Sequence, residues 1–123
     1  MITKDERKKL RKALKALQTW GCMRNWEIKL QFGVMEGKFG TAEIQDQYRQ
    51  AVIIINPEAN YNTGFKHDTC VQTLCHEFAH IWLWDVHHPE LYNSNWAYTK
   101  LVEQTVEDIG RVLYLRVLRP LGY

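Results

Sequence analysis

The chain has 123 residues, 46% hydrophobic and 24% charged, which is the composition of an ordinary globular protein. This length supplies one hydrophobic core, so we expect a single domain over residues 1–123. The net charge of +2 predicts no nucleic-acid partner, and no apolar run is long enough to span a bilayer. The oligomeric state is not indicated.

The compartment is predicted from the N-terminus and the cysteines. The first residues are charged where a signal peptide would have its apolar segment, so we expect a cytoplasmic protein. The three cysteines, Cys22, Cys70 and Cys75, have neither disulfide nor zinc-binding spacing. They are therefore expected to be free, buried thiols.

An amphipathic helix and three short strands are the first elements in chain order. Residues 3–20 have apolar side chains at helical spacing, and Thr3 and Glu6 have the spacing of a capping box. Strands are predicted at residues 26–32, in GTAEIQ from about residue 40, and in QAVIIIN. The polar segment DQYR between the last two predicts a hairpin turn, so we expect an antiparallel meander.

Two further helices, separated by a loop, complete the chain. Asp68 is expected to cap a helix that ends near residue 83, and Ser94 or Asn95 to cap a last helix that ends before Pro120. The five tryptophans are expected to fill the core of this small domain. The order of elements predicts an α+β fold with a mainly antiparallel three-stranded sheet.

The first of these two helices contains the pattern H-E-x-x-H at residues 76–80. Residues four apart lie on the same helix face, so His76 and His80 can bind one zinc ion together. Glu77 can reach a water at the open coordination position, take its proton, and pass the proton to the leaving amine. We therefore predict that the two histidines are zinc ligands and that Glu77 is the catalytic base.

The two histidines could instead be ordinary core or solvated side chains. A helical wheel places them nearly opposite the apolar side of the helix, which argues against a core position. That apolar side consists of Val71, Leu74, Cys75, Phe78 and Trp82. Around the histidines lie the uncharged Thr73, Ala79 and Leu83, which argues against a solvated face. The pattern is typical of a covered face with a polar centre.

A third zinc ligand could come from a nearby histidine or from the last helix. His87 and His88 follow the motif, but the metzincin spacing would require a histidine where Val86 stands. A histidine further along, as in SprT-like proteases, is absent. On the last helix Glu103 and Glu107 share a face, and Glu103 lies closer to the apolar stripe. The alternative is that both glutamates form a solvated charge pair.

Together the two helices resemble the gluzincin zinc metallopeptidases, in which H-E-x-x-H is followed by E-x-x-x-D/E on a later helix. The resemblance implies that Glu103 is the third zinc ligand and that Glu107 hydrogen-bonds a ligand histidine without touching the metal. The order of elements is also similar to minimal gluzincins and to small metallopeptidase-like proteins of phages and prophages. This chain departs from the larger gluzincins in having Glu107 instead of aspartate, and Val102 instead of asparagine before the first acid.

The resemblance implies a zinc metallopeptidase, endopeptidase rather than exopeptidase, that cleaves peptide bonds through a zinc-bound water activated by Glu77. Its partner would be a peptide or protein substrate, laid along a sheet edge by strand addition. The alternative is a non-catalytic, zinc-stabilised binding or regulatory domain of phage type. The presence of Glu77 favours the enzyme, because a structural site has no use for it. An oxyanion stabiliser could be one of several residues beside the motif. The candidates are Tyr61, Tyr92, Tyr98, His87 and His88.

Overall fold

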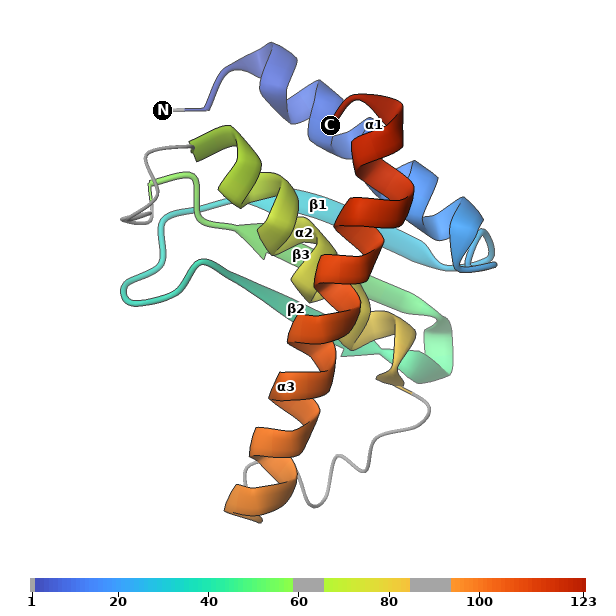
Figure 1. Cartoon of the computed structure of the whole chain (residues 1–123), viewed down its shortest axis with the longest axis vertical. Coiled ribbons are helices and arrows are strands. Elements are labelled where there is room, and N and C mark those ends of the chain that lie inside the picture. The colour runs from blue at the N-terminus through green and yellow to red at the C-terminus, as the bar shows by residue number, and fades with distance from the viewer. Residues whose placement is uncertain (1, 59–65, 85–93) are drawn as a thin grey trace.

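The structure, a computed structural model of the whole chain, describes residues 2–58, 66–84 and 94–123, with side chains except at residues 66–69. Its main elements follow the order predicted from the sequence (Figure 1). They are α1 (Lys4–Trp20), β1 (Glu27–Phe32), β2 (Gly40–Gln45), β3 (Gln50–Ile55), α2 (Lys66–Trp82) and α3 (Trp96–Leu113). The α+β fold class is therefore confirmed. Within the described ranges, no helix is long and apolar enough to cross a bilayer.

The sheet is mixed and has the strand order β1-β3-β2, so the predicted meander was wrong. Strand β3 pairs in parallel with β1 and antiparallel with β2. It is the most apolar strand and buries Ala51, Ile53 and Ile55, and a central position gives it a neighbour on both sides. The predicted turn between β2 and β3 is confirmed: it consists of the short helical segment Asp46–Tyr48 and the left-handed Arg49 (φ 52°).

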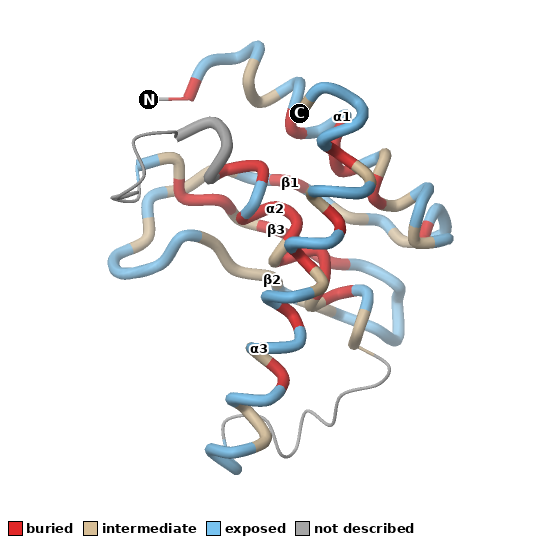
Figure 2. Tube along the Cα trace, viewed as in Figure 1, coloured by how far each residue is buried: buried red, intermediate tan, exposed pale blue. Residues whose placement is uncertain are grey.

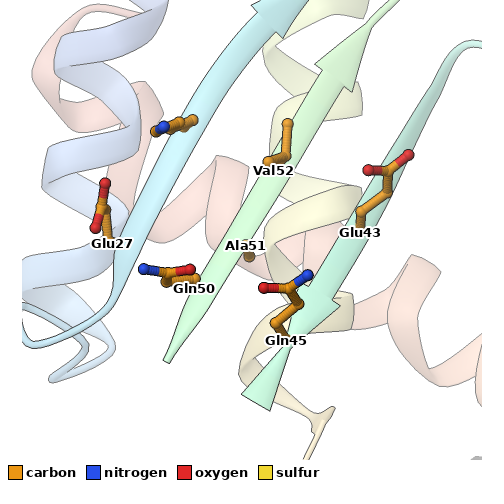
Figure 3. Close-up of a pocket in the computed structure, with 7 residues that line it drawn as sticks. Glu27, Glu43, Gln45, Gln50, Ala51 and Val52 are labelled. Carbon is orange, nitrogen blue, oxygen red and sulfur yellow. The ribbon is translucent and has the colours of Figure 1, made fainter. Parts of the chain in front are cut away.

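The helices cover one face of the sheet and leave the other face open. Helix α2 packs on β2 and β3, and both α1 and α3 contact α2. Buried residues follow α2 and the sides of the other elements that face it (Figure 2). From the open face project Glu27, Glu43, Gln45 and Gln50, around a hollow of about 150 Å³ (Figure 3). The H-E-x-x-H motif therefore lies on the opposite, helical side of the sheet.

The helix starts agree only partly with the sequence analysis. Thr3 caps α1 as predicted, because its Oγ1 accepts a hydrogen bond of 3.1 Å from the Glu6 backbone N–H. Asn95 caps α3 in the same way, accepting 3.0 Å from the Tyr98 backbone N–H. Helix α2 begins at Lys66, so Asp68 lies inside the helix and the prediction that it is the cap was wrong.

Two expectations about buried side chains were also wrong. Cys22 is exposed, whereas the other two cysteines are buried as predicted, and all three are free. Burial raises the pKa of Cys75 to about 12, which keeps this thiol unreactive. The tryptophans do not all fill the core, since three are exposed: Trp20, Trp82 and Trp96. The first two of these contact each other at the surface with tilted rings, whose centroids are 5.3 Å apart.

After α3 the chain continues as a π-helical segment, η3 (Tyr114–Leu118), and a short 3-10 turn, η4 (Arg119–Leu121). Leu113 and Leu118, at either end of the wide turns, are both fully buried. In an α-helix, residues five apart point about 140° away from each other. The wider turns of a π-helix reduce this angle and let both leucines enter the core.

Candidate active site

Helices α2 and α3 approach closely where Gly110 faces His76. A Cβ atom at Gly110 would lie 3.2 Å from Cα and 3.3 Å from the backbone nitrogen of His76. A side chain at position 110 would therefore push the two helices apart. Their close approach brings the acidic face of α3 over the histidine face of α2.

His76, His80 and Glu103 form a cluster whose possible ligand atoms all lie within 4.8 Å of one another. Glu103 Oε2 is 3.6 Å from His76 Nε2, and Glu103 Oε1 is 3.5 Å from His80 Nε2. Ligand atoms placed tetrahedrally at 2.0–2.1 Å from zinc are about 3.4 Å apart. Two imidazole nitrogens and one carboxylate oxygen also form the donor set of catalytic zinc sites that leave one position open. The residues present thus fit a zinc ion in both spacing and chemistry.

Glu107 contacts the other ring nitrogen of the same histidine. Its Oε2 lies 3.2 Å from His76 Nδ1, and its Oε1 lies 4.0 Å from Arg111. A carboxylate that accepts the Nδ1 proton leaves Nε2 as the nitrogen able to bind a metal. The geometry is compatible with the roles predicted for Glu103 and Glu107, and these roles stay predictions.

Glu77 is buried beside this cluster, with only 6% of its surface exposed. Burial raises the pKa of its carboxyl to about 7, the charge of Glu103 adds to the rise, and Lys38 opposes it. The burial comes from β2, which packs tightly on α2 at Gly40. A Cβ at Gly40 would lie 2.7 Å from Thr73 Cγ2 and 3.4 Å from Glu77 Cγ. A carboxyl with a pKa near neutrality is suited to take up and release a proton.

A cleft of about 560 Å³ opens beside the cluster, and His76 and Glu77 are among the residues that line it. Its walls come from the start of β2, from the turn of α2 before the motif, and from the last turns of α3 with η3. The motif glutamate therefore lies at a cleft on the protein surface.

Tyr114 lines this cleft and was not singled out in the sequence. A signal was available, because Tyr114 follows Glu107 by seven residues, which is two helical turns on the same face. Tyr98 lies in the first turn of α3 and is not among the residues that line the cleft. The other four candidate oxyanion stabilisers lie outside the described residues. They are Tyr61, His87, His88 and Tyr92.

Comparison with known families identifies the chain. A family model described as SprT-like matches residues 7–107, which is most of the sequence. The chain belongs to the SprT-like family. The chain matches this family although no histidine follows His88, the position range in which a third histidine ligand was sought. Among curated proteins and among solved structures, none matches the chain significantly.

SprT-like proteins are small and zinc-metallopeptidase-like, so the match supports the resemblance to minimal gluzincins. In this SprT-like chain the motif histidines are joined by Glu103 from α3, and the three residues could hold a metal ion. The family and the cluster point to the same class of protein.

Proposed function

We propose that this SprT-like protein is a zinc-dependent peptidase in which Glu77 is the general base. The observation that carries the proposal is the position of Glu77: it is buried, it adjoins the His76, His80 and Glu103 cluster, and it lines an open cleft. The two histidines and Glu103 would hold the zinc. When bound, zinc supplies a Lewis acid that polarises a carbonyl and lowers the pKa of water.

The proton transfers are proposed for Glu77. Its carboxylate would take a proton from the attacking water and then donate this proton to the amine that leaves. A pKa of about 7 suits both steps, because the group neither holds nor loses its proton too strongly. Glu107, 3.2 Å from His76 Nδ1, would hold the imidazole ring in orientation.

Cleavage within a chain is proposed rather than removal of a terminal residue. The cleft of about 560 Å³ is lined by Phe39 and Leu115 as well as by His76, and so has room for residues beyond the cleaved bond. The partner would therefore be a peptide or an unfolded protein segment. The cytoplasmic location stays a prediction from the sequence.

The test compares wild type with Glu77→Gln, both loaded with zinc, on a library of peptides made from a digested proteome. Glutamine keeps the shape of the side chain and removes the base. We expect wild type to cleave peptides, as seen by mass spectrometry, and Glu77→Gln to cleave none while retaining zinc. If zinc-loaded wild type cleaves nothing, the alternative of a non-catalytic zinc-stabilised domain replaces the peptidase.

A further inference from the structure

Two large apolar side chains lie exposed in the cleft. Phe39, directly before β2, is 51% exposed, and Leu115, in η3, is 42% exposed. Tyr114 also lines this cleft. Apolar surface gains about 25 cal/mol for each Å² removed from water, so an apolar group placed between these side chains would be stabilised. Exposed apolar surface of this kind in a cleft is typical of a binding site.

The histidine and the charged side chains that line the cleft either belong to the motif or contact one another. His76 and Glu77 belong to the motif, Glu107 contacts His76, and Arg111 is 4.0 Å from Glu107. A charged substrate side chain placed against Phe39 and Leu115 would lose its water and gain no hydrogen bond or ion pair from these two residues. The chemistry of Phe39 and Leu115 therefore favours an apolar side chain.

The position of Leu115 along the helix indicates how far this subsite lies from the chemistry. Gly110 is level with His76, at 3.2 Å from its Cα. Leu115 is five residues further on, which is about 7.5 Å along a helix at 1.5 Å per residue. An extended peptide advances about 3.3 Å per residue, so this distance corresponds to about two residues of substrate.

Resting on the proposed peptidase function, we propose that the part of the cleft lined by Phe39 and Leu115 is a specificity pocket for a large apolar side chain. The side chain would belong to a substrate residue within about two positions of the cleaved bond. Gly40, directly after Phe39, lets β2 pack closely on α2 beside this pocket, because a Cβ there would already lie 2.7 Å from Thr73 Cγ2 and 2.9 Å from the Ile54 carbonyl oxygen. The protein would thus cut beside leucine, methionine or phenylalanine.

The test measures cleavage-site preference in the peptide library for wild type, Phe39→Ser and Leu115→Ser. We expect wild type to favour sites with a large apolar residue within two positions on one side of the bond. Each variant should cleave these sites roughly 10-fold or more slowly, the usual effect of lost apolar contact in a pocket. Sites without such a residue should be cleaved as before. Val112→Ser is the matched control, because Val112 is an exposed apolar residue near Leu115 that is not among those lining the cleft.

A binding measurement separates the pocket from the peptidase. Zinc-loaded Glu77→Gln is titrated with a fluorescent hexapeptide containing one leucine, and with the same peptide containing serine instead. The leucine peptide should bind more tightly, and Phe39→Ser in the Glu77→Gln background should remove the difference. Equal binding of the two peptides overturns the pocket, even if wild type proves to be a peptidase. Conversely, a leucine preference in binding without any cleavage overturns the peptidase and leaves the pocket. Leu115→Ala serves as a milder variant if a serine variant melts below wild type.

Discussion

The Oε2 atom of Glu107 lies 3.2 Å from Nδ1 of His76, while Glu103 approaches Nε2 of the same ring. One imidazole is thus contacted at both nitrogens by acids one helical turn apart. The two contacts are chemically different, because a metal between Glu103 and Nε2 leaves Nδ1 with a proton to donate. The roles of the two glutamates are therefore separable by mutation.

We expect Glu103→Ala to weaken zinc binding far more than Glu107→Ala. Loss of a carboxylate that contacts a ligand histidine typically costs about 10–100-fold in affinity, whereas loss of a ligand removes one metal bond. The measurement is a competition titration with a chelating dye at fixed pH, because protons compete with zinc for the ligands. Asp108→Ala, an exposed acid of the same helix, is the control.

The reverse order of effects would mean that the two glutamates have exchanged roles. If neither variant changes the affinity for zinc, the third ligand is elsewhere, with His87 and His88 as the next candidates.

Zinc removal should destabilise the protein. The cluster joins α2 to α3, and a metal bound only by the folded state stabilises it by RT ln(1 + [Zn]/Kd), about 2.7 kcal/mol at 100 times Kd. We expect about one zinc per chain by elemental analysis, given that the described residues contain one three-residue cluster with donors of this type. We also expect a melting temperature several degrees lower after chelation. A melting curve that does not respond to added zinc would contradict the metal site.

The metal-free protein should lose stability between about pH 4.5 and pH 7. Glu77 has a pKa raised to about 7 in the folded protein, against an ordinary value of 4.5. The folded state therefore holds this proton more tightly than the unfolded state. The resulting stabilisation is complete below the unfolded pKa and is lost as the pH rises through the folded pKa, and it amounts to about 3 kcal/mol.

This pH effect can be isolated with Glu77→Gln, whose side chain does not titrate. The free energy of unfolding, measured in urea with chelator at pH 5 and pH 8, should fall less in Glu77→Gln than in wild type. Comparing the two proteins cancels the titration of the histidines, which they share. Glu36→Gln, at an exposed position, should behave as wild type. An equal fall in Glu77→Gln and wild type would show that Glu77 does not hold its proton in the folded state.

Gly110→Ala should lower the affinity for zinc, although Gly110 touches no metal. The added methyl group would lie 3.2 Å from His76 Cα. A backbone atom cannot change rotamer to make room, so α3 must move away from α2. Overpacking of this kind costs about 1–3 kcal/mol, partly offset by the gain of about 1 kcal/mol from alanine in a helix. Gly33→Ala is the matched control, because its new Cβ would lie 3.7 Å from Ile54 Cγ2, an ordinary contact. Equal zinc affinity in Gly110→Ala and wild type would show that the helices adjust without moving the ligands.

Local patterns predicted the elements and the candidate site well. The spacing of apolar residues located the helices and strands, and the four-residue spacings placed His76, His80, Glu103 and Glu107 on two helix faces that the structure brings together. Each of these patterns lies within one helix or strand, so it can be recognised from the sequence alone. The capping side chain of Thr3 is equally local and was equally predictable.

Features that depend on contacts between distant elements were not predicted. The three strands compete for the central, covered position of the sheet, and β3 takes it. The outcome depends on all three strands, so the pattern of any one strand does not show it. Trp82 lies on the apolar side of its helix by periodicity, yet its ring contacts that of Trp20 at the surface because the core ends there. The cleft joins Phe39 to η3 across most of the sequence, so its lining could not be read from either segment alone.

The π-helical segment Tyr114–Leu118 lies between the metal cluster and the last turns of the described chain, so a change of length in those turns need not affect the cluster. A π-helical stretch is equivalent to an α-helix with one inserted residue. Such an insertion changes the phase of the residues from the segment onward, here η3, which packs on α1, and η4, and it changes nothing before the segment. Glu103 and Glu107 lie before it and keep their register with His76 and His80. A residue added to or removed from this segment would therefore change how tightly it is wound and would leave the metal cluster unaltered.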